Sequence, residues 1–350
     1  MSTFFAYERL GPDRFAERHG LDFEDFQAGQ RFLHRPGLTV SQQDNAEHAL
    51  DTGNSAMLHF DAAYAAHTSW GEPLVVSTLT AQRVIGLSAK TFARRRALLG
   101  FDEITLPAPV HDGDTLYAES RVLAAAAGPD PDCGVLTLET AGRNALGAEV
   151  IRLRYEAEIY RRGRGPAADG RGPAAAEPRF AAYDLVGDAY RERFGLYFED
   201  CRAGDTFVHR PGRSFLRDEA IAQARRSMEI APQYHDLEFA GQYLGGRLRI
   251  PETFVLAAAA TASTRTFGRV AANLGWQQVR LPTPVNAGDT VRAESQILSA
   301  RPSRSRPGEG VVCVATRAAN QHGEPVVSFR RTLLVYRRDA DTPYGPAGYG

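Results

Sequence analysis

The chain has 350 residues, of which 43% are hydrophobic and 24% are charged, and its formal net charge is −1. These values predict a globular protein with room for two domains, and they exclude a broad electrostatic attraction to nucleic acid or to an anionic membrane. No apolar run approaches the roughly 18 residues of a membrane span, and the N-terminus is charged too early for a signal peptide. The three cysteines form no CxxC pair, which favours a reducing, cytoplasmic setting over a disulfide framework or a zinc–thiolate site.

The sequence is duplicated internally. Residues 20–37 read GLDFEDFQAGQRFLHRPG and recur as GLYFEDCRAGDTFVHRPG at residues 195–212. Residues 106–115 recur at residues 281–290, so both matches lie 175 positions apart. Two matches at a single separation predict that the two halves share one fold.

The duplication sets the predicted domain bounds. We predict an N-terminal domain over residues 1–162, which carries the candidate active site, and a C-terminal domain over residues 181–339, which carries a degenerate copy. Residues 163–180 between them are rich in glycine, proline and alanine, a composition typical of a flexible linker. Residues 340–350 predict a disordered tail.

Each half has the same predicted order of elements, here given for the first. A short strand ends at Pro36-Gly37, and short helices follow around residues 42–52 and 61–67. From Ser77 to Arg94 the apolar and small residues recur with helical spacing, which predicts a longer helix. The counterpart of this helix, residues 254–262, is apolar on all sides and should be buried more completely.

After the longer helix, the pattern changes to the two-residue period of strands. Strands are predicted over residues 115–123, 135–140 and 150–160, with a tight polar turn at residues 144–147 before the last one. A helix followed by a meander of long strands predicts an α+β fold. In this fold an antiparallel sheet wraps around the helix, and each buries one face against the other.

The stretch Thr52–Asp61 is the candidate functional region. It places Asn54, His59 and Asp61 in a tight turn between two predicted helices, an unusual position for three polar groups that serve packing alone. Each residue also has a structural alternative: a hydrogen-bonded structural histidine for His59, and helix capping or turn formation for Asn54 and Asp61.

Several stretches resemble a known family. In the first half they are Gly53-Asn54, His59-Phe-Asp61 and residues 73–80, and in the second half they include residues 273–282 and 320–331. Together they resemble the MaoC-like (R-specific enoyl-CoA hydratase) family, and within it the mesaconyl-CoA hydratase (methylmalyl-CoA dehydratase) branch. The resemblance implies two tandem hotdog domains that form a pseudo-dimer, so that the protein works as a pseudo-dimeric monomer or as a homodimer.

The resemblance also implies a reaction, the reversible hydration of a 2-enoyl thioester of CoA or of an acyl-carrier protein, without a cofactor or metal. The family places an Asp five residues before its His, where this sequence has Asn54. An amide cannot accept a proton at ordinary pH, so Asn54 can orient a water and His59 must serve as the base. Asp61 or, less directly, Asp51 is the candidate for the missing carboxylate. The backbone N–H groups of Val76 and Ser77, at the start of the longer helix, are the expected donors to the thioester oxygen.

The second half is expected to have lost the site. The residues 175 positions after Asn54, His59 and Asp61 are Glu229, Tyr234 and Asp236. Two alternatives stay open beside the hydratase: a hotdog thioesterase, and a protein that binds acyl thioesters without chemistry. The histidines His34 and His209 recur in both halves, which indicates a role in the fold.

Overall fold

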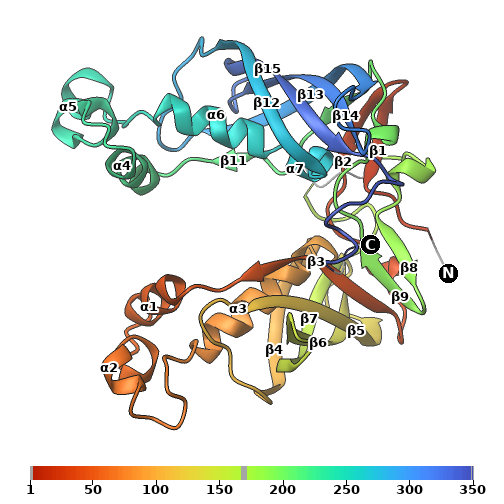
Figure 1. Ribbon diagram of the computed structural model, residues 1–350, viewed down its shortest axis with the longest axis vertical. Helices are drawn as coiled ribbons and strands as arrows, with labels where there is room; N and C mark the ends of the chain where they lie inside the picture. The colour runs from red at the N-terminus through yellow and green to blue at the C-terminus, as the bar shows by residue number, and fades with distance from the viewer. Residues whose placement is uncertain (1–2, 167–171, 348, 350) are drawn as a thin grey trace. The chain divides into compact units, whose positions relative to one another are not determined.

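The computed structural model describes residues 3–166, 172–347 and 349. Within these ranges no helix has both the length and the apolar character that crossing a bilayer requires. The chain divides into two units, each of which contains a curved sheet and one main helix packed against it (Figure 1). This is the predicted fold, two tandem hotdog domains, each with a sheet wrapped around a central helix.

The first unit contains α3, the predicted central helix, and a sheet with the strand order β4-β7-β6-β5-β3-β9-β8. Its strands are β3 (Arg31–Thr39), β4 (Arg95–Thr105), β5 (Thr115–Ala127), β6 (Cys133–Asn144), β7 (Glu149–Tyr160), β8 (Tyr183–Val186) and β9 (Ala189–Glu192). Its helices include α1 (Gln42–Asp51), η2 (Met57–His59), α2 (Ala62–Ala65) and α3 (Ser77–Leu87).

The second unit repeats this plan around α6, with the strand order β1-β2-β10-β13-β14-β15-β12 and with β11 paired to β13. Its strands are β1 (Tyr7–Gly11), β2 (Arg14–Glu17), β10 (Thr206–Val208), β11 (Arg213–Ser214), β12 (Val270–Arg280), β13 (Thr290–Pro302), β14 (Glu309–Ala319) and β15 (Pro325–Tyr336). Its helices include α4 (Arg217–Arg226), η7 (Pro232–Tyr234), α5 (Leu237–Tyr243), α6 (Glu252–Thr261) and α7 (Thr264–Phe267).

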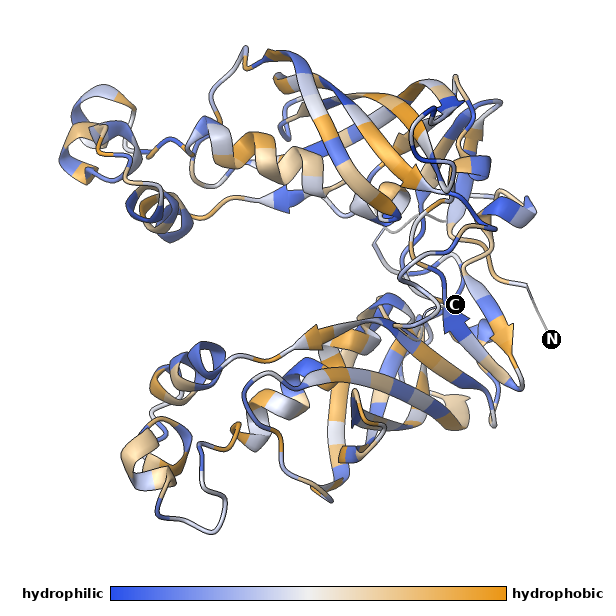
Figure 2. Ribbon diagram, viewed as in Figure 1, coloured by the Kyte–Doolittle hydropathy of each residue, from blue (hydrophilic) through white to orange (hydrophobic). Residues whose placement is uncertain are grey.

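The core of each unit lies between the central helix and the sheet. Leu79 and Val84 of α3 are buried against the inner faces of β5, β6 and β7, whose side chains alternate between buried and partly exposed. The alternation of apolar and polar residues along the strands is visible in Figure 2. The fuller burial expected for the second helix is at most slight, because Thr253, Ala257 and Thr261 form an exposed stripe along α6, and α3 has a similar stripe of four exposed residues.

The edge strands β4 and β12 were not predicted, and neither were the hairpin strands β1, β2, β8 and β9 or the short β11. The helix predicted to reach Arg94 ends at Leu87, and β4 begins at Arg95. β4 and its counterpart β12 lie at the edges of their sheets, and most of their residues are exposed. An edge strand of this kind lacks the alternating pattern that a half-buried strand shows.

The compact units do not follow the predicted bounds at residues 162 and 181. The hairpin β1–β2, which precedes the first repeat, belongs to the second unit, where β2 pairs parallel to β10. The hairpin β8–β9, which precedes the second repeat, belongs to the first unit, where β9 pairs parallel to β3. The two repeats thus exchange their N-terminal hairpins.

The predicted linker and tail are also partly ordered. Ala175 and Phe180 are buried in the core of the second unit, although residues 167–171 of the predicted linker lie outside the described residues. In the predicted tail, the Tyr344 ring packs on Tyr336 and under the guanidinium of Arg269. Residues 172–180 are therefore part of the second unit and not a free linker.

The recurring histidines have the structural role expected of them. His34 is fully buried, with its Nδ1 3.0 Å from Glu192 of the exchanged hairpin and its Nε2 2.8 Å from the Ser120 hydroxyl. In the second unit, His209 makes the same contacts with Glu17 and Ser295 at the same distances. Each exchanged hairpin therefore supplies the carboxylate partner of a buried histidine.

Candidate active site

The turn after α1 is formed by a glycine and an amide. Gly53 has a φ of +69°, a left-handed conformation that glycine adopts without steric cost. The Oδ1 atom of Asn54 accepts a hydrogen bond from the backbone N–H of Ala56 at 3.0 Å. This contact closes an Asx turn, so Asn54 shapes the loop that leads into η2. Asp51, the weaker carboxylate candidate, is exposed at the last position of α1.

His59 ends η2 and is partly exposed. Its Nδ1 lies 2.8 Å from the backbone carbonyl oxygen of Leu74. Because a carbonyl oxygen can only accept, Nδ1 carries the proton, and the neutral ring presents a lone pair at Nε2. No group in the described part of the chain forms a hydrogen bond with Nε2. The imidazole is therefore held in the tautomer that a general base requires.

The organising residue of this region is Asn45 of α1, whose side chain is fully buried. Its Nδ2 donates to the carbonyl oxygens of His59, at 2.8 Å, and of Leu74, at 2.9 Å. Its Oδ1 accepts a hydrogen bond from the Val76 N–H at 2.8 Å. Sequence analysis missed Asn45, although one signal was present: the position 175 residues later is Ala220.

At the start of α3, one of the two predicted oxyanion donors is ruled out. The Val76 N–H is engaged by Asn45, so it is not available to a thioester oxygen. Ser77 is the first residue of α3 and is exposed, and its N–H has no partner among the described residues. A free N–H at the positive end of the helix dipole is suited to a developing negative charge.

Asp61 has a structural function. Its Oδ1 accepts a hydrogen bond from the Tyr64 N–H at 3.0 Å, so it caps the N-terminus of α2. No hydrogen bond or ion pair joins Asp61 to His59 within the described ranges. The structure therefore brings His59 and the start of α3 together through Leu74, and it leaves Asp61 at the neighbouring helix.

A family model described as mesaconyl-CoA hydratase matches residues 10–184 and, separately, residues 176–347. The chain belongs to the mesaconyl-CoA hydratase family. A mesaconyl-CoA hydratase of Haloarcula marismortui is 26% identical over 329 residues, which cover 90% of each chain. The one from Cereibacter sphaeroides is 32% identical over 161 residues, 43% of each chain. A solved Mycobacterium tuberculosis protein described as a double hotdog fold is 23% identical, with a TM-score of 0.39 over 91% of this chain and 99% of its own.

In this member of the mesaconyl-CoA hydratase family, a comparison of the two repeats distinguishes residues that serve the fold from residues that serve chemistry. Glu229 takes the place of Asn54, and its Oε1 accepts the same type of bond, from the Ala231 N–H at 2.9 Å. Asp236 takes the place of Asp61 and caps α5. Positions 54 and 61 therefore keep their local hydrogen bonds in a half that lacks the histidine, which assigns these bonds to the fold.

The histidine position itself has changed. Tyr234 replaces His59, and its hydroxyl donates to Glu252 at 2.5 Å. Glu252 replaces Ser77 as the first residue of α6, and Pro251, which has no N–H, replaces Val76. A carboxylate at the helix start would repel a developing enolate, so the second repeat is unsuited to the family's reaction.

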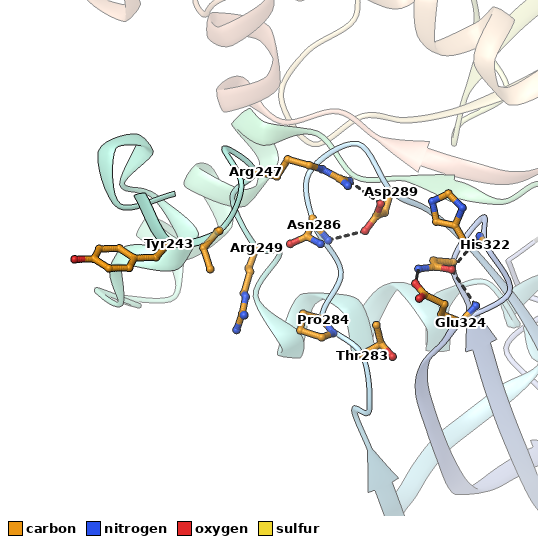
Figure 3. Close-up of a pocket in the computed structure, with 11 residues that line it drawn as sticks. Tyr243, Arg247, Arg249, Thr283, Pro284, Asn286, Asp289, His322 and Glu324 are labelled. Atoms are coloured by element: carbon orange, nitrogen blue, oxygen red, sulfur yellow. Dashed lines mark hydrogen bonds and ion pairs between the residues drawn. The ribbon is translucent and has the colours of Figure 1, made fainter. Parts of the chain in front are cut away.

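The second unit also has a polar pocket of about 310 Å³ near the turn that follows β14 (Figure 3). Arg247 extends toward Asp289, 2.6 Å away, and Asn320 donates to Glu324 at 2.7 Å, while Arg249 also lines the pocket. The pocket is polar and differs in character from the histidine region of the first repeat.

Proposed function

We propose that the protein is a hydro-lyase that adds water reversibly to the 2,3-double bond of a 2-enoyl thioester in its first repeat. The single observation that carries this proposal is the bond between His59 Nδ1 and the Leu74 carbonyl oxygen, in a member of a hydratase family. Leu74 lies three residues before Ser77. The base His59 is therefore hydrogen-bonded to the same short segment that carries the oxyanion donor, the Ser77 N–H.

In the proposed reaction, Nε2 of His59 takes a proton from water while the water oxygen forms a bond to the β-carbon. The electron pair of the double bond moves onto the α-carbon and the thioester carbonyl, and the Ser77 N–H stabilises the resulting enolate oxygen. The imidazolium then returns its proton to the α-carbon, which restores the neutral ring. This sequence needs no metal or redox cofactor.

The proposed substrate is an acyl thioester, of which mesaconyl-CoA is the first to test, since the related proteins from Haloarcula and Cereibacter carry that name. In this proposal the thioester carrier is either CoA or an acyl-carrier protein. The enzyme acts either as a monomer or as a homodimer. Sedimentation of the purified protein addresses the second point.

The direct test incubates the purified protein with mesaconyl-CoA and crotonyl-CoA while enoyl absorbance and free thiol are followed together. A hydratase should cause loss of enoyl absorbance without thiol release, whereas a thioesterase releases thiol and a binding protein changes neither signal.

His59→Ala should lower kcat by about 10²- to 10⁴-fold, the usual contribution of a general base. The matched control is His235→Ala, in the corresponding loop of the second repeat, which should keep wild-type activity. Full activity in His59→Ala would refute the site.

A further inference from the structure

The Leu74 carbonyl oxygen receives two hydrogen bonds, from His59 Nδ1 at 2.8 Å and from Asn45 Nδ2 at 2.9 Å. A carbonyl oxygen has two lone pairs, so both are occupied. The Asn45 amide also holds the backbone carbonyl of His59 and the N–H of Val76. One buried side chain thus contacts the backbone of the histidine, the acceptor of its ring proton, and the residue that precedes α3.

The second repeat shows what the same backbone does without this amide. Ala220 replaces Asn45 and is fully buried, and Pro251 replaces Val76. Both partners of the bond between the amide and the N–H are therefore absent from the repeat that has Tyr234 in place of His59. The backbone is nevertheless the same, with φ and ψ of −58° and 129° at Val76 and of −51° and 127° at Pro251.

The surrounding backbone bonds agree with this comparison. The Leu74 N–H donates to the Leu58 carbonyl, and at the equivalent place the Arg249 N–H donates to the Gln233 carbonyl. The segment before the helix therefore forms in the second repeat without an amide at the position of Asn45. The path of this backbone therefore does not depend on the amide, although in the first repeat the amide also satisfies the buried Val76 N–H.

We infer that Asn45 is a positioning residue that acts through His59. By fixing the Leu74 carbonyl it holds the ring in the Nδ1-protonated tautomer, with Nε2 free to accept a proton. By engaging the Val76 N–H it leaves the Ser77 N–H as the donor for the thioester oxygen. The catalytic meaning of this role rests on the proposed function, whereas its effect on the His59 ring does not.

The test replaces Asn45 and Val76 with the residues found at the equivalent positions of the second repeat, alanine and proline. Asn45→Ala alone leaves the buried Val76 N–H without a partner, so its melting temperature should fall. In the double variant Asn45→Ala/Val76→Pro that N–H no longer exists, and much of the stability should return. The kcat of the double variant should stay lowered by about 10- to 100-fold, the usual cost of losing an orienting partner. Gln43→Ala, on the exposed side of α1, is the control and should match the wild type in both measurements.

Two further measurements separate positioning from a general structural effect. In a His59→Ala background, the double substitution should cost no further activity, because the residue through which Asn45 acts is gone. In ¹⁵N NMR spectra of the ring, His59 should be Nδ1-protonated in the wild type and a tautomer mixture in the double variant. An unchanged ring signal together with wild-type kcat in the stable double variant would overturn the inference. If the wild type hydrates no thioester but the ring signal changes, the proposed function fails and the positioning contact stands.

Discussion

At the scale of single residues, the second repeat acts as an internal control for the first. Asn54 and Asp61 were selected from the sequence as site residues, yet their counterparts Glu229 and Asp236 make the same local bonds in a half without the histidine. His59 and Asn45 have no such counterparts. The comparison therefore leaves His59 as the proposed base and Asn45 as its support.

A first prediction concerns Asn54. Asn54→Asp keeps an oxygen that can accept the Ala56 N–H, so hydratase activity should stay within a few-fold of the wild type. Asn54→Ala loses the turn contact and should lower the free energy of unfolding by about 1 kcal/mol. Urea denaturation and steady-state rates measure both effects. Glu229→Ala, in the second repeat, should lose stability to a similar extent and keep full activity, and a large activity loss in Asn54→Asp would contradict the turn role.

At the scale of elements, the start of α3 is the feature that chemistry depends on. Val76 precedes the helix in an extended conformation, and Ser77 stands at the first helical position. Proline is well tolerated at that position because its missing N–H has no partner within the helix. The oxyanion donor can therefore be removed while the helix is kept.

A second prediction follows from this geometry. Ser77→Pro should lower kcat by about 10²- to 10³-fold, the usual effect of losing one oxyanion donor, with little change in melting temperature. Ser77→Ala removes only the hydroxyl and keeps the N–H, so it should retain activity. Circular dichroism melts and initial rates distinguish the two variants. Equal activity in both would show that the backbone N–H of Ser77 has no part in the reaction.

The elements also show how far sequence reasoning reaches. Strands with one buried face, such as β5 and β7, were predicted from their alternating pattern, whereas the exposed edge strands β4 and β12 have no such pattern. His59 was found through family resemblance. Asn45 was missed because its backbone partners lie 14 to 31 residues away along the chain, so no local motif connects them. A comparison of the repeats at Asn45 and Val76, position by position, contained the only signal.

At the scale of the whole molecule, the exchanged hairpins join the two repeats. Tyr190 of β9 stacks on Phe32 in the first unit, with 5.4 Å between ring centroids, and Glu192 of the same strand meets His34. Burial alone would raise the pKa of Glu192, but the hydrogen bond and charge of His34, with smaller contributions from Lys90 and Thr91, hold it below its usual 4.5. The buried carboxylate is thus stabilised in its charged form.

A third prediction tests this contact. A carboxylate with a lowered folded-state pKa stabilises the fold above its unfolded pKa, and that stability is lost as the pH falls through the folded-state pKa. Glu192→Gln should therefore cost about 1–3 kcal/mol of unfolding free energy at pH 7, and the difference from the wild type should shrink below about pH 4.5. Melting curves from pH 7 to pH 3 measure it, with Glu47→Gln on the exposed side of α1 as the control. A gap that is the same at pH 3 and pH 7 would exclude the charged contact as its source.

The hairpin exchange also has a consequence for synthesis. A ribosome makes the chain from its N-terminus at about 5–20 residues per second, so the first repeat is complete before β8 and β9 exist. His34 has no carboxylate partner until Glu192 has been made, and β1 and β2, the first strands made, have no sheet to join until β10 emerges. The final packing of each repeat therefore depends on a segment that is translated with the other.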